Sequence, residues 1–214
     1  MTEPGDFVDA ALQFESSWRR AEEDAARIGG DLRFYGSSVG AIRGTLRNLG
    51  RRYPDLTRDD IVALSSELWR EPVFERRLAA VVLLQSNLSR LTEFDLTRIE
   101  GFLRSGGVRE LVDPLATEVV GPLVETLDAR ARARADAALD RWAGDGDEWL
   151  RRAALMASVG ALRAGGGDWS VFSRRADAVL AASTRVADVA TEALSAVLED
   201  LEAARPELSF RPHR

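Results

Sequence analysis

The sequence contains no cysteine and only one histidine, His213, which lies next to the C-terminus and is expected to belong to a frayed tail. Without cysteine, disulfide bonds and thiolate metal sites are excluded. With a single terminal histidine, Ser–His–Asp and Cys–His catalysis and the usual zinc ligand sets are excluded as well. Any chemistry must therefore rest on Asp, Glu, Arg, Tyr, Ser or Thr, and no metal site is expected.

Lysine is also missing, since all 29 basic residues are arginine, and the net charge is −6. An acidic total does not by itself suggest nucleic-acid binding, and an all-arginine set is what codon bias in a GC-rich genome produces. Each arginine nevertheless carries a planar fork that can grip a phosphate at two points. An acidic total can hide a basic face, so the arrangement of the arginines matters more than their sum.

Long hydrophobic runs are absent too, because no stretch approaches the roughly 20 apolar residues of a membrane span. The first residues, MTEPGDFVDA, lack a basic region followed by an apolar stretch, so no secretory signal is expected and the default location is cytoplasmic. A composition of 45% hydrophobic and 30% charged residues suits one globular domain with a real core. We place that domain at residues 1–205 and a C-terminal tail at 206–214.

Helical periodicity, by contrast, recurs from end to end. Asp6 is expected to cap a first helix that runs to Gly29-Gly30, and Pro72 to occupy the first turn of a later one. Pro114 and Pro122 imply breaks or kinks. Other helices are expected to begin at Thr57, Thr92 and Asp147, and a last one to run from about Val186 to Ala204.

No segment shows the alternation of a strand flanked by hairpin turns, so the fold class is all-α. About ten helices joined by short loops, in pairs of roughly 35 to 45 residues, suggest an α-solenoid of HEAT-like antiparallel helix pairs in one curved domain. A compact helical bundle is the rival arrangement.

Four segments carry a resemblance, in one order, over about residues 6 to 182. They are the YGxxVxxIR pattern of Tyr35–Arg43, LWREPVFERRLAAVVLL (Leu68–Leu84), LVDPLATEVVGPL (Leu111–Leu123) and DEWLRRAAL (Asp147–Leu155). Together they resemble the AlkD-type DNA alkylation repair family, the HEAT-like-repeat alkylpurine DNA glycosylases. By that resemblance the protein hydrolyses the N-glycosidic bond of N3- and N7-alkylated purines in duplex DNA, and it needs no cofactor or metal.

The resemblance also implies roles for single residues. Asp113 stands at the position of the family's catalytic aspartate, where a carboxylate would stabilise the positive charge that develops on the sugar. Arg152 stands at the position of an arginine that faces DNA phosphate, and Tyr35 either reaches the DNA or belongs to the core. We expect a monomer that binds duplex DNA without any membrane contact.

The sequence departs from the family at two tryptophans that pack against the lesion. Arg109 replaces the first, where we expect it to hold phosphate, and Ala193 or Ala196, depending on register, replaces the second. The last helix is also acidic and counts Asp188 among its acids, which would repel a DNA backbone. A second hypothesis therefore stands beside the glycosylase: a catalytically inactive HEAT-like-repeat protein that binds DNA or a protein partner.

Two further features have both a structural and a functional interpretation. Asp113 followed by Pro114 reads as a helix N-cap with proline at the first helical position. Arg43, Arg47 and Arg51 are spaced four residues apart, which places three guanidinium groups on one helical face. That face could follow a phosphate backbone, or it could be a solvent face paired with acids.

Overall fold

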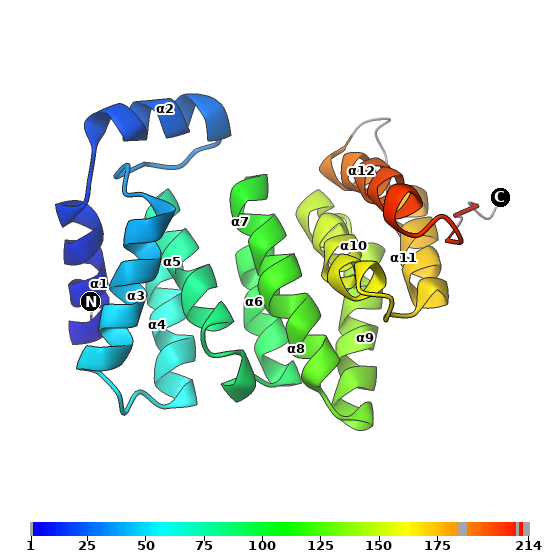
Figure 1. The fold of residues 1–214 in the computed structure, drawn as a ribbon, viewed down its shortest axis with the longest axis horizontal. Coiled ribbons are helices and arrows are strands. Elements are labelled where there is room, and N and C mark those ends of the chain that lie inside the picture. Colours follow the sequence, from blue (N-terminus) through cyan, green and yellow to red (C-terminus); the bar gives the residue numbers. More distant parts are fainter. Residues whose placement is uncertain (1, 184–187, 209, 212–214) are drawn as a thin grey trace. The chain divides into compact units, whose positions relative to one another are not determined.

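A computed structural model describes residues 2–183, 188–208 and 210–211, and His213 lies outside them (Figure 1). These residues are almost entirely helical, and among them there is no strand, only an isolated parallel bridge between Arg33 and Val73. The predicted all-α fold is therefore confirmed, and its helix pairs are consistent with an α-solenoid. The chain divides into two compact units, an N-terminal unit (Met1–Leu91 and Gly107–Leu111) and a C-terminal unit (Thr92–Gly106 and Val112–Arg214). A single curved domain over residues 1–205 stays a prediction.

In the described part of the N-terminal unit, every α-helix buries apolar residues except α2 (Trp18–Ile28), which buries none. α3 packs against both α1 and α5. α4 packs against α5, and the short segment Glu71–Val73 connects the two. In Figure 1, α2 runs across the direction of these helices. The helices are α1 (Glu3–Phe14), α2 (Trp18–Ile28), α3 (Val39–Arg52), α4 (Arg58–Arg70) and α5 (Phe74–Gln85), followed by a 3-10 turn at Leu88–Arg90.

Two predicted helix starts in this unit are wrong. The first helix is capped by Thr2, not by Asp6, and it ends at Phe14 instead of reaching Gly29-Gly30. A new helix begins after Ser17, whose side chain accepts a hydrogen bond from the third residue of that helix. Pro72 also stands outside the helix predicted there, because α5 begins at Phe74 after an extended residue. The predicted start at Thr57 is confirmed by a full capping box.

The C-terminal unit is organised around one central helix, α10, which is buried on most of its faces. It packs against α12, α9, α8, α11, α6 and the π-helical segment. The elements are a 3-10 turn (Glu93–Asp95), α6 (Leu96–Arg104), the second half of α7 (Arg109–Pro114), the π-helical segment (Leu115–Val120), α8 (Gly121–Thr126), α9 (Ala129–Ala143), α10 (Glu148–Arg163), α11 (Trp169–Ala182) and α12 (Val189–Ala204). The first half of α7, up to Leu111, belongs to the N-terminal unit.

The expected interruption at Pro114 and Pro122 takes the form of the π-helical segment between them. Neither proline has an N–H to donate, and in this stretch the α-helical pattern gives way to a wider turn without ending the helical run. Gly121 then lets α8 approach α10 closely, since a Cβ there would lie 2.4 Å from the Ala157 carbonyl oxygen.

The last helix begins later than predicted. Val186 lies outside the described residues, and α12 begins at Val189 with Asp188 as its N-cap. Within the described ranges, every helix is too short or too polar to span a lipid bilayer.

Candidate functional site

Asp113 and Arg152 form a two-point ion pair within the C-terminal unit. The Arg152 Nε and Nη2 atoms donate to the two carboxylate oxygens of Asp113, each at 2.6 Å. Nη1 of the same guanidinium donates to the Val189 carbonyl oxygen at 2.8 Å. Three of the five N–H donors of Arg152 are therefore engaged. The Arg152 side chain is only 8% exposed and that of Asp113 is 27% exposed, so the carboxylate is the partner that solvent can reach.

The N-cap interpretation of Asp113 is wrong. The chain is already helical four residues before Asp113 and remains helical after it. Its carboxylate accepts both hydrogen bonds from Arg152 instead of from the backbone of a following turn. Asp113 is thus fixed by a side chain from another helix, which leaves its orientation dependent on α10.

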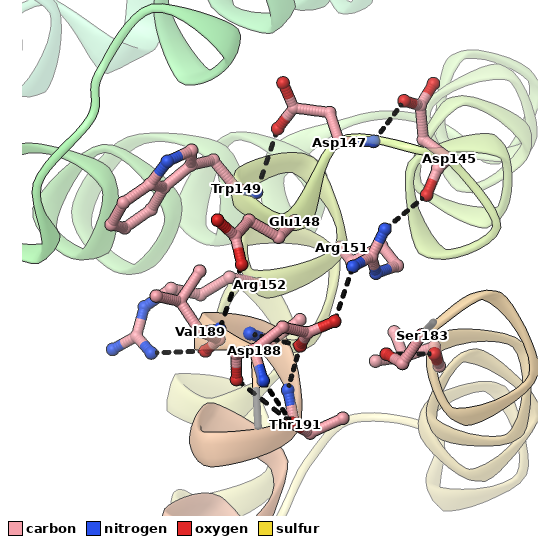
Figure 2. Close-up of polar contacts among 12 residues, drawn as sticks. Asp145, Asp147, Glu148, Trp149, Arg151, Arg152, Ser183, Asp188, Val189 and Thr191 are labelled. Atoms are coloured by element: carbon pink, nitrogen blue, oxygen red, sulfur yellow. Dashed lines mark hydrogen bonds and ion pairs between the residues drawn. The ribbon is translucent and has the colours of Figure 1, made fainter. Parts of the chain in front are cut away.

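The neighbouring arginine of α10, Arg151, points to a different partner, as Figure 2 shows. Its Nη1 donates to the Asp145 carbonyl oxygen at 2.7 Å and its Nη2 to the Asp188 carboxylate at 2.6 Å. The side chains of Arg151 and Asp188 are 5% and 3% exposed, so this ion pair is buried. The other carboxylate oxygen of Asp188 caps α12 by accepting from the Ala190 and Thr191 N–H groups at 3.0 and 2.8 Å.

These contacts also set the charge state of Asp188. Burial disfavours its ionised form, but the Thr191 backbone N–H and the Arg151 guanidinium outweigh burial, and the pKa of the Asp188 carboxyl lies below its ordinary value. An ionised Asp188 is therefore the state that the buried arginine and the helix end both stabilise.

The backbone of Val189 is held at both of its polar atoms by α10. Its N–H donates to the Glu148 carboxylate at 3.3 Å, and its carbonyl accepts from Arg152 (Figure 2). Glu148 and Arg152 stand four residues apart, on one face of α10. Because Val189 is the first residue of α12, this face fixes where that helix begins.

The residues expected at the family's two tryptophan positions differ in exposure. Arg109 is exposed and lies four residues before Asp113 on α7. On α12, Ala193 is buried at 2% exposure, whereas Ala196 is exposed. The outward face of α12 carries Glu192, Glu199 and Glu202 at exposed positions.

Tyr35 belongs to a polar network of the N-terminal unit. Its hydroxyl donates to the Asp9 carboxylate at 3.0 Å, and its backbone N–H donates to the buried Glu75 carboxylate at 3.0 Å. Burial, followed by the bond to Asp9, raises the pKa of Tyr35 above its ordinary value. Gly36 beside it has a φ of 76°, and a Cβ there would lie 2.1 Å from the Ser17 carbonyl oxygen, so only glycine fits.

Arg43, Arg47 and Arg51 are exposed along α3, as their spacing predicts. Among the described residues none of the three forms an ion pair, unlike most arginines of the chain. The interpretation of this face as one paired with acids is therefore wrong for the described part of the chain. These residues and Tyr35 lie in the N-terminal unit, whereas Asp113 and Arg152 are brought together in the C-terminal unit.

Sequence reasoning missed Arg151 and Asp188 as a connected pair. Asp188, counted among the acids of the last helix, is its N-cap, and the Asp188-x-x-Thr191 spacing is a readable capping box. The described residues contain no cluster of three or more His, Cys, Asp or Glu side chains that could hold a metal ion.

A scan against models of protein families matches residues 8–201 to the family described as DNA alkylation repair enzyme. A search of curated proteins gives no significant match.

Proposed function

Because the chain belongs to the family of DNA alkylation repair enzymes, we propose that it is a DNA glycosylase that hydrolyses the N-glycosidic bond of N3- or N7-alkylated purines in duplex DNA. The observation that carries this proposal is the Asp113 carboxylate, which Arg152 holds at two points while part of it remains exposed. As a monomer acting on duplex DNA, the protein would work in the cytoplasm, without a metal or cofactor.

Hydrolysis of this N-glycosidic bond requires few catalytic groups. An alkylated purine carries a positive charge, so the electron pair of the breaking bond neutralises the base and no general acid is required. Positive charge develops on the deoxyribose instead, and a fixed carboxylate beside it stabilises that charge. Water then attacks the sugar carbon, and its proton passes to the carboxylate or to solvent.

The ion pair limits how strong this stabilisation can be. With an effective dielectric constant of about 20, a carboxylate about 4 Å from the sugar cation contributes about 4 kcal/mol, while a guanidinium about 8 Å away opposes it by about 2 kcal/mol. The net effect of about 2 kcal/mol corresponds to a rate factor of about 30. We therefore propose weak base release in which Asp113 is catalytic and Arg152 is a positioning residue.

DNA contacts would come from the arginines that the structure leaves exposed. Arg43 and Arg47 present guanidinium groups along one face of α3, and Arg109 is exposed on α7. Arginine forks are suited to phosphate oxygens, which position a duplex without reading its sequence. For Arg152, a phosphate contact would have to use the two donors that Asp113 and Val189 leave over.

A base-release assay tests the proposal directly. DNA carrying N7-methylguanine and N3-methyladenine is incubated with enzyme in excess, and free base is measured for wild type, Asp113→Asn and Asp200→Asn. Asp200 is a matched control, because it also accepts from an arginine, Arg163, at 2.6 Å but at an exposed site. We expect release by wild type and the control, and a fall to the level of buffer in Asp113→Asn, because this change removes the favourable contribution of about 4 kcal/mol and leaves the opposing guanidinium in place. If wild type releases no more than buffer, the non-catalytic protein that binds DNA or a protein partner takes its place.

A further inference from the structure

The first turn of α12 is tied to α10 by two arginines that differ in what they hold. Arg151 holds the N-cap Asp188, and Arg152 holds the Val189 carbonyl oxygen (Figure 2). Only Arg152 continues on to Asp113. Asp188 and Val189 are consecutive residues, so a shift of the N-cap moves the carbonyl that Arg152 contacts.

We propose that Arg151 and Asp188 are positioning residues that orient the Asp113 carboxylate through Val189 and Arg152. This inference rests on the proposed function for its catalytic consequence. Its structural part, the linkage from Asp188 to Arg152, stands independently of any activity.

The geometry favours this linkage over a purely local role for the buried pair. The Arg151 guanidinium is fixed at both ends, by the Asp145 carbonyl and by the Asp188 carboxylate, and its Nε makes no hydrogen bond. It therefore connects the turn before α10 to the start of α12. The next residue of α10, Arg152, makes one hydrogen bond to α12 and two to Asp113.

The ion pair with Arg151 requires the negative charge of Asp188, whereas the capping of α12 requires only an oxygen acceptor. Asp188→Asn keeps an acceptor for the Ala190 and Thr191 N–H groups, because asparagine caps helices about as well as aspartate. It removes the negative partner of a buried guanidinium. Asp168→Asn is the matched control, since Asp168 caps α11 through the same pattern of backbone contacts at an exposed position.

The catalytic consequence follows from distance. A displacement on the order of 1 Å in a reacting group can lower a rate by about 100-fold. We expect Asp188→Asn to lower the single-turnover rate of base release by about 10-fold, which is less than the factor of about 30 that Asp113 and Arg152 together supply. The affinity for undamaged duplex DNA should stay within about twofold, because neither Arg151 nor Asp188 is exposed to contact phosphate.

The deciding measurement does not need activity. In 15N-labelled full-length protein, the Nε–H signal of Arg152, identified by its disappearance in Arg152→Lys, reports the bond to Asp113. We expect its proton to exchange with solvent about tenfold faster in folded Asp188→Asn, and at the wild-type rate in Asp168→Asn. Arg151→Lys keeps the charge but can reach only one of the two partners, Asp145 or Asp188. In this variant the exchange rate of the Arg152 Nε–H proton should lie between those of wild type and Asp188→Asn.

The outcomes separate the two proposals. An unchanged Arg152 signal in folded Asp188→Asn overturns the positioning role, whatever the activity. If the signal changes and wild type releases base, the rate must fall without a change in DNA affinity, and an unaltered rate also overturns the role in catalysis. If the signal changes but wild type releases no base, the linkage is upheld and the glycosylase proposal alone fails.

Discussion

Replacing Asp113 by asparagine should destabilise the protein as well as slow base release, because the carboxylate is the partner of a buried arginine. Asparagine matches the shape of aspartate but offers one acceptor oxygen in place of two. Its amide N–H₂ group would face a guanidinium nitrogen, donor against donor. Arg152, at 8% exposure, cannot recover the lost bond from bulk water.

The size of the effect follows from the two contacts. A hydrogen bond to a charged group contributes about 1.5–3 kcal/mol, so two of them bring about 3–6 kcal/mol for a fully buried pair. The Asp113 side chain is 27% exposed, and solvent weakens the interaction. We therefore expect a coupling free energy of about 2–3 kcal/mol between the two side chains, and a cost of similar size for Asp113→Asn alone.

A double-mutant cycle measures this coupling. Urea unfolding at neutral pH is followed for wild type, Asp113→Asn, Arg152→Met and the double variant. Arg152→Met keeps the apolar stem and removes the charge, and it should cost less than Asp113→Asn because an unpaired Asp113 can be hydrated. A coupling below about 0.5 kcal/mol, the range of exposed surface pairs, would show that the ion pair does not hold the carboxylate.

Three other outcomes are expected. Gly36→Ala should lower the free energy of unfolding by about 2–4 kcal/mol, because its Cβ would lie 2.1 Å from a backbone oxygen at a residue with positive φ. Gly29→Ala, at a positive φ but with open space around it, should lower it by only about 1 kcal/mol. Equal losses of the two variants in urea unfolding would contradict this prediction. The pKa of Asp188 is depressed in the folded state, so its contribution to stability is full above the unfolded value of about 3.9 and is lost as the pH falls through the folded pKa. The difference in unfolding free energy between wild type and Asp188→Asn should thus be constant from about pH 5 to 7 and become smaller below about pH 4. A difference that does not change with pH would contradict the role of the ionised Asp188 in stability. If DNA binds, replacing Arg43 and Arg47 by glutamine should reduce the slope of log affinity against log salt by about 2, and an unchanged slope removes both residues from the interface.

The helices could be predicted largely because their signals are local. The capping box at Thr57 and the cap at Asp147 are formed by residues within one turn, and the sequence shows them directly. The division between α1 and α2 has a local signal as well, the Ser17 cap, but a second contact that holds it is not local. It depends on Ser17, whose backbone N–H donates to the Tyr35 carbonyl oxygen, a contact between residues far apart in the sequence.

The candidate site shows the same limit more sharply. Asp113 could be identified by resemblance, but its partner comes from α10, 39 residues further along the chain. Hydrophobic periodicity cannot predict which acid a given arginine meets. The cap at Asp188 was within reach of sequence reasoning through its spacing to Thr191, while its ion pair with Arg151 was not.

The pattern around the two arginines of α10 bears on which function the sequence motif indicates. Glu148 and Arg152 hold the first residue of α12, and Arg151 holds its N-cap Asp188, so the charged residues of this segment have a structural explanation that does not involve DNA. A non-catalytic scaffold would need the same contacts, and the motif alone therefore cannot distinguish an enzyme from a binding protein. Solvent exposure does distinguish them, because the two carboxylates that these arginines hold differ in how far solvent reaches them. Asp188 is 3% exposed at its side chain and is closed to a substrate, whereas Asp113 is 27% exposed and is open to solvent. A structural ion pair would gain nothing from that exposure, since solvent weakens it, and the accessible face of Asp113 is thus the feature that favours catalysis.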